Sequence, residues 1–133
     1  MKSLKNEKGQ SLVEFAILLP VLLLLIMGIL EFGLMLNSYL TINNSAREGA
    51  RLGVVVGSNL GSDTEISDLI KKISPNLNRE DLTINIMPSL AGRKSGGTIS
   101  VEVKYNYKLT IPIISNILGN VMVLKAQTSM RIE

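Results

Sequence analysis

The residues that most plainly suggest chemistry lie near the start of the chain, where a basic head meets a long apolar run. Gly9 ends the basic head, and a single carboxylate, Glu14, stands five positions later at the beginning of the apolar run. A charge so close to bilayer depth is costly, so its presence indicates a specific role. A cut after Gly9 would create a new ammonium at Gln10, about one helical turn from Glu14. The chemistry expected of Glu14 is therefore ion pairing with an amine, either its own or that of a neighbouring subunit.

The composition offers little for catalysis. The 133 residues include no cysteine and no histidine, which excludes thiolate chemistry, disulfides and a histidine-based triad. Zinc sites usually need one of these two residue types. We therefore expect no enzyme, and no catalytic residue, metal site, cofactor or small-molecule substrate. The net charge of +3 is mild, and a lysine cluster occurs only at Lys2, Lys5 and Lys8, so no nucleic-acid partner is expected either.

The apolar run predicts one transmembrane helix at residues 10–36. Residues 15–30 contain no polar side chain, and Phe32 to Leu36 continue the run beyond Glu31. About 20 apolar residues suffice to cross a bilayer. A secretory signal has a shorter apolar core, of about 7–15 residues, and a small-residue cleavage site that is missing here. The lysines before the helix favour a cytoplasmic N-terminus, with residues from about Asn37 onward outside a cytoplasmic membrane.

Two residues inside this helix call for an explanation. Pro20 lacks a backbone donor and crowds the carbonyl of Ala16, which predicts a kink. The kink would be a flexible point for subunit packing, or simply a proline of the kind that membrane helices tolerate. Glu31 lies 17 positions after Glu14, about 25 Å along a helix. The two carboxylates would then sit near opposite interfaces of a hydrocarbon core about 30 Å thick.

Several short motifs in residues 8–53 together resemble those of a known family. They are Gly9, Glu14-Phe15, Leu19-Pro20, Glu31-Phe32-Gly33, Ala46-Arg47 and Ala50-Arg51. In this order they resemble TadE-like proteins, the minor pilins or pseudopilins of the tight-adherence (Flp-type) type IV pilus system. Leu34 departs from the pattern, since many relatives carry a polar or basic residue there.

The resemblance implies how the chain would be processed and used. Residues 1–9 would be a leader that a prepilin peptidase removes on the cytoplasmic face, between Gly9 and Gln10. Glu14 and Phe15 would belong to the processing and assembly motif. The partners implied are other pilin or pseudopilin subunits and the pilus assembly machinery, and the subunit itself could enter a surface pilus.

The helix is expected to continue outside the membrane over residues 37–56. Small residues recur at helical spacing within it, at Ala46, Gly49, Ala50 and Gly53. Such a stripe allows another backbone to approach closely. It would be a packing seam for a partner subunit or for the chain's own sheet, or an ordinary covered helix face.

Residues 57–133 predict a small α+β domain. A turn at residues 57–62 precedes a short amphipathic helix, capped by Ser62 or Asp63 and ended at Ser74-Pro75. Alternation predicts strands at residues 82–87, 99–109 and 122–132, which form a three-stranded, mainly antiparallel sheet. One face would pack on the two helices, and residues 111–119 would be an apolar crossover.

Two metal or ligand sites in this domain have simpler explanations. Asp63, Glu65 and Asp68 suggest calcium, but capping and a polar helix face account for them, because no loop of ligand-like spacing follows. The loop at residues 92–97 lacks phosphate-binding spacing and leads into a strand, so we expect a mobile hairpin connection there.

The sequence thus predicts a minor pilin or pseudopilin that acts in pilus assembly or adhesion. The alternative is an uncleaved single-pass membrane protein whose outward-facing domain binds a ligand. A membrane-anchored enzyme is a third candidate, which the missing histidine and cysteine disfavour.

Overall fold

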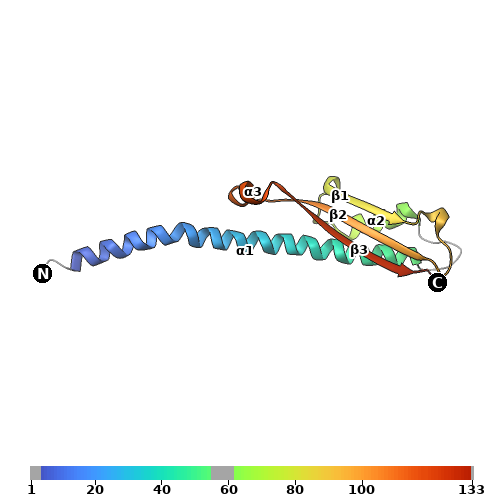
Figure 1. Cartoon of the computed structure of the whole chain (residues 1–133), viewed down its shortest axis with the longest axis horizontal. Helices are drawn as coiled ribbons and strands as arrows, with labels where there is room; N and C mark the ends of the chain where they lie inside the picture. Colours follow the sequence, from blue (N-terminus) through green and yellow to red (C-terminus); the bar gives the residue numbers. More distant parts are fainter. Residues whose placement is uncertain (1–3, 55–61, 133) are drawn as a thin grey trace. The chain divides into compact units, whose positions relative to one another are not determined.

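The computed structural model of the protein describes residues 4–54 and 62–132 (Figure 1). The chain divides into two compact units, Met1–Leu34 and Met35–Glu133. The helices are α1 (Leu4–Val54), α2 (Asp63–Ile73) and α3 (Pro112–Leu118), with 3-10 turns at Arg79–Asp81 and Leu90–Gly92, and the strands are β1 (Leu82–Met87), β2 (Thr98–Lys108) and β3 (Val121–Arg131). The predicted α+β class, with a long N-terminal helix and a three-stranded antiparallel sheet, is confirmed.

The first unit consists of the N-terminal part of α1. The large apolar side chains between Leu12 and Leu34 keep 38% to 69% of their surface exposed. The helix is long and apolar enough to cross a membrane. Within the helix, Pro20 is surrounded by continuous helical backbone. Because so much apolar surface is unfavourable in water, the unit is consistent with a membrane anchor.

The second unit is built on an antiparallel sheet with the order β1-β2-β3. Val103 on the central strand lies opposite Ile84 of β1 and Ala126 of β3, and all three point to the same face. That face forms a core together with residues of α1 and α2, with Leu77 after α2 and with Ile132 after β3. The buried core residues are Ile42, Ala46, Ala50, Ile66, Ile70, Leu77, Ile99, Val101, Val103, Ala126 and Ile132. The helices thus give the sheet the cover that a small sheet requires.

The start of α2 confirms the predicted cap. The Ser62 hydroxyl accepts a hydrogen bond from the Glu65 amide at 3.2 Å, and the Glu65 carboxylate accepts one from the Ser62 amide at 2.8 Å. These two bonds satisfy two backbone donors that the helix itself leaves without partners. Hydrogen bonds that the Ser62 amide and then the Ser62 hydroxyl donate to the Glu65 carboxylate hold the pKa of Glu65 below its usual value. The amphipathic pattern then buries Ile66 and Ile70.

The segment between β2 and β3 differs from the prediction in one respect. The apolar crossover predicted at residues 111–119 is a hairpin connection between neighbouring strands, and it contains the helix α3. Pro112 at its first turn has the backbone angle that a helix start requires. The predicted end of the outer helix at residues 55–56 and the turn at residues 57–61 lie outside the described residues.

Candidate processing and assembly site

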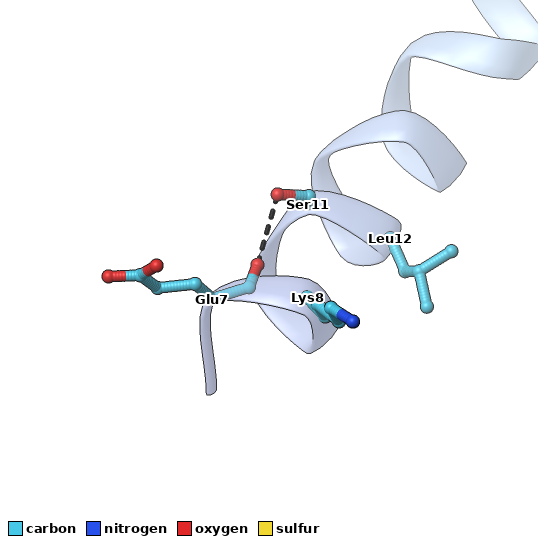
Figure 2. A pocket seen from close by; sticks show the side chains of 4 residues that line it. All are labelled: Glu7, Lys8, Ser11 and Leu12. Atoms are coloured by element: carbon cyan, nitrogen blue, oxygen red, sulfur yellow. Dashed lines mark hydrogen bonds between the residues drawn. The ribbon is translucent and has the colours of Figure 1, made fainter. Parts of the chain in front are cut away.

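The predicted cleavage point lies inside the first turns of α1. Gly9 and Gln10 are both helical and exposed. Figure 2 shows the side chains around them, which line a shallow hollow on the surface of this single helix: Glu7, Lys8, Ser11 and Leu12. The Ser11 hydroxyl donates a hydrogen bond to the Glu7 carbonyl oxygen at 3.0 Å (Figure 2). A hollow formed by one helix does not enclose a ligand, but it leaves this peptide segment open to another protein.

Gly9 does not serve internal packing. A methyl group added at its Cα would meet no atom within 4 Å. Glycine in a helix interior costs about 1 kcal/mol relative to alanine. In the described part of the chain, then, Gly9 weakens the helix locally without relieving a clash.

Glu14 lies one turn after Gln10 and contacts it. The Gln10 side-chain amide donates a hydrogen bond to the Glu14 carboxylate, with 3.2 Å between Nε2 and Oε1. Side chains of a helix lean towards its N-terminus, which brings the Glu14 carboxylate towards the backbone of Gln10. An ammonium at Gln10 would therefore form within reach of a carboxylate that is already oriented towards it.

Phe15 belongs to an apolar face of the same helix. It lines an open apolar hollow with neighbours that include Leu18, Leu19 and Leu22, at three- and four-residue spacing. Phe15 itself keeps 59% of its surface exposed. A surface of this kind suits either lipid or the apolar face of another helix.

The four small residues of the predicted seam face the second unit's own elements. Ala46 and Ala50 are fully buried. A methyl group added to Gly49 would lie 2.8 Å from Cδ1 of Ile70, and one added to Gly53 would lie 2.4 Å from Cδ1 of Ile99. The small side chains therefore allow α1 to approach α2 and β2. A seam for another subunit stays a prediction.

Arg93 is a buried cation that the sequence interpretation did not single out. Its guanidinium forms an ion pair with Asp63 at the start of α2 and donates a hydrogen bond to the Pro88 carbonyl oxygen at 3.2 Å. The loop at residues 92–97, predicted to be a mobile connection, is thus tied to a helix. The residues of the loop do not indicate this ion pair, because Asp63 lies 30 positions before Arg93.

A second cluster that the sequence interpretation missed lies on the sheet face opposite the core. The Glu102 carboxylate accepts from Lys125 at 2.6 Å, from Lys104 at 2.9 Å and from Asn85 at 3.3 Å. The hydrogen bonds from Lys125 and then Lys104 lower the pKa of Glu102 to about 2. Lys104 and Lys125 are direct cross-strand neighbours. Their shared carboxylate offsets the repulsion expected between like charges in that position.

The acidic residues near α2 have other partners than a metal. Asp63 pairs with Arg93, and Glu65 completes the helix cap. Within residues 4–54 and 62–132, no group of three or more acidic, cysteine or histidine residues could hold a metal ion.

Comparison with known protein families gives one match, which covers most of α1. The family model described as TadE-like protein matches residues 9–51. The match begins at Gly9, and it confirms the resemblance that the sequence motifs suggested. No curated protein and no solved structure matches the chain.

Proposed function

We propose that this chain is a minor pilin or pseudopilin of a tight-adherence pilus. A prepilin peptidase would remove residues 1–9 on the cytoplasmic face, and the mature subunit would act in pilus assembly or adhesion. The match of residues 9–51 to the TadE-like model carries this proposal, because it associates the segment with the tight-adherence pilus system. The long apolar helix provides the membrane anchor that such a subunit needs.

The surroundings of Gly9 support cleavage at this position. The glycine is exposed and has no neighbour that a methyl group would touch, so internal packing does not explain why it is there. Recognition by a peptidase does explain it, since a glycine lets another backbone approach closely and loosens the helix at the bond to be cut.

Glu14 supports a role for the mature N-terminus in assembly. Its carboxylate already contacts Gln10, which becomes the first residue after the cut. An ammonium and a carboxylate at the edge of a bilayer stabilise each other, because either charge alone is costly there. The partner carboxylate would be that of the same subunit or of the adjacent one.

The competing function is an uncleaved single-pass membrane protein with an outward-facing binding domain. Under that function residues 1–9 would persist, and Gly9 would have no role. For this alternative, we identify no ligand-binding residue in residues 4–54 and 62–132.

The deciding measurement is the intact mass and N-terminal sequence of the protein from its own membranes, with and without the prepilin peptidase. We expect a start at Gln10 that is lost when the peptidase gene is deleted. A start at Met1 in both strains would refute processing and favour the binding protein.

A matched pair of glycine variants separates recognition from helix stability. Gly9→Ala and Gly28→Ala both place a methyl group in open space on α1, so both should strengthen the helix by about 1 kcal/mol. Only Gly9→Ala should leave the leader uncut. Equal processing of the two variants would show that Gly9 is not read by the peptidase.

A further inference from the structure

The turn between β2 and β3 carries an unusual amount of exposed apolar surface. Ile113 and Ile117 on α3 keep 49% and 75% of their surface exposed, and Leu118 keeps 62%. Val121 and Val123, at the start of β3, are exposed as well. None of the residues of α3 is buried. We name Leu109–Leu124 the hairpin tip.

Charge is confined to the borders of this segment. Residues 109–124 contain no charged side chain, and a lysine stands immediately on each side. Lys108 pairs with Asp81 at 2.8 Å, and Lys125 pairs with Glu102 at 2.6 Å. The uncharged segment thus begins directly beyond two ion pairs. An apolar segment bordered by lysines suits a membrane interface, because apolar side chains are buried there while cationic groups stay in the headgroup region.

The tip lies at a defined end of the second unit. The first core residue of β2, Ile99, packs next to Gly53 near the C-terminal end of α1. From Ile99, β2 runs to Lys108 at the base of the tip, a distance of about 30 Å. Going back along α1 from Gly53 to Met35 covers about 27 Å. Within this unit β2 runs alongside α1 in the opposite direction (Figure 1). Because β2 leads into α3, α3 lies at the end of the unit that contains Met35.

That end of the unit is also where the chain leaves the apolar span. Leu36, Tyr39 and Leu40 of α1 are exposed there. Tyrosine is enriched where a membrane protein meets the headgroup region. The hairpin tip therefore lies at the end of the second unit from which the chain continues into the apolar span.

We infer that the hairpin tip is a second membrane contact, which inserts Ile113, Ile117 and Leu118 into the headgroup and acyl boundary of the outer leaflet. The inference rests on the proposed membrane placement of α1. Interfacial segments bury their apolar side chains by about 5–10 Å. The ion pairs of Lys108 and Lys125 would mark the depth at which insertion stops.

The absence of cysteine permits a direct test with the full chain. Single variants Ile117→Cys, Gln127→Cys and Leu23→Cys would each carry an environment-sensitive fluorophore. The protein would be placed at one copy per nanodisc of phosphatidylethanolamine and phosphatidylglycerol. Ile117 and Gln127 are both exposed, so neither label removes packing, and Gln127 lies on the polar sheet face as the control.

We expect the label at residue 117 to emit further to the blue than that at residue 127, to lose quenching by iodide and to gain quenching by shallow spin-labelled lipids. Iodide quenching at 117 equal to that at 127, with residue 23 still quenched by lipid, would overturn the tip contact and leave the membrane span intact. A blue-shifted label at 117 that lipid does not quench would overturn it in favour of protein cover. Iodide access at residue 23 would refute the span and the tip contact together.

Discussion

Single carboxylates determine the local electrostatics near the start of α1 and on the polar face of the sheet. The Glu14 carboxylate accepts a hydrogen bond from Gln10, so under the proposed processing the new ammonium would be adjacent to it. Glu102 holds two lysines that would otherwise repel each other across neighbouring strands. In both places a carboxylate determines whether nearby positive charge is tolerated.

Replacing Glu14 with alanine should leave leader cleavage intact but strongly reduce piliation. The new ammonium at Gln10 would then lack a carboxylate one turn away, and an unpaired charge at the membrane edge is costly. Electron microscopy and a shear assay measure the result. Glu7→Ala is the control, because it removes an exposed carboxylate that leaves with the leader. Normal piliation in the Glu14 variant would refute the pairing.

The Glu102 cluster predicts a specific dependence of stability on pH. The folded-state pKa of about 2 lies below the ordinary value of 4.5. A lowered pKa means that the carboxylate stabilises the fold above about pH 4.5 and that this contribution is lost as the pH falls towards 2. In detergent micelles, urea unfolding of the full chain should show this loss. Glu102→Gln should lower stability at pH 7 and flatten the dependence in that window.

Asp68→Asn provides the comparison for this experiment, since it removes an exposed carboxylate of α2. An equal flattening by both substitutions would show that the Glu102 cluster is not the cause. A carboxyl titration of Glu102 by NMR with a midpoint near 4.5 would contradict the cluster directly.

At the scale of elements, the glycines of α1 have different surroundings in the two units. Gly28 and Gly33 have no atom within 4 Å of an added methyl group, whereas Gly49 and Gly53 face isoleucines of α2 and β2. A larger side chain would therefore fit at the glycines of the first unit, whereas packing requires glycine at positions 49 and 53 in the second unit.

Gly53→Leu should destabilise the second unit, whereas Gly28→Leu should not. A leucine at position 53 would overpack the fully buried Ile99 and Ile66, at a cost of about 1–3 kcal/mol or more. Pulse proteolysis of the two variants in micelles would compare the free energies of unfolding. Equal stability of the variants would show that α1 does not pack closely against β2.

Periodicity was sufficient to predict α2 and the three strands, because the alternating residues of β2 and the spacing of Ile66 and Ile70 reflect one buried face each. It did not predict α3, since Pro112–Leu118 is short and its two polar residues, Ser115 and Asn116, are adjacent and do not repeat at helical spacing. The contacts of Glu102 with Asn85 and Lys125, and of Arg93 with Asp63, could not be predicted either, because they join residues 17 to 30 positions apart and depend on strand register and on the path of a loop. The local pair Gln10–Glu14 was predictable because it lies within one helical turn.

On the scale of the whole molecule, the orientation in the membrane is a prediction that labelling can check. In spheroplasts that lack the prepilin peptidase, a membrane-impermeant maleimide should label Gln127→Cys, and it should label Lys8→Cys only after lysis. We expect this pattern because lysines that precede a membrane span favour the cytoplasmic side. Labelling of Lys8→Cys in intact spheroplasts, with Gln127→Cys protected, would reverse the orientation.

The core of the second unit joins residues that are made at very different times. Ile42 of α1 and Ile132 after β3 are both buried in it, about 90 positions apart in the sequence. Contacts of such large sequence separation form slowly, because a long loop must close first. Under the proposed topology, residues 37–54 of α1 would reach the outer side before the strands, and Ile42 would stay uncovered until the strands follow. A chaperone or a partner helix that covers this surface during that interval would therefore control how much of the protein reaches its folded state.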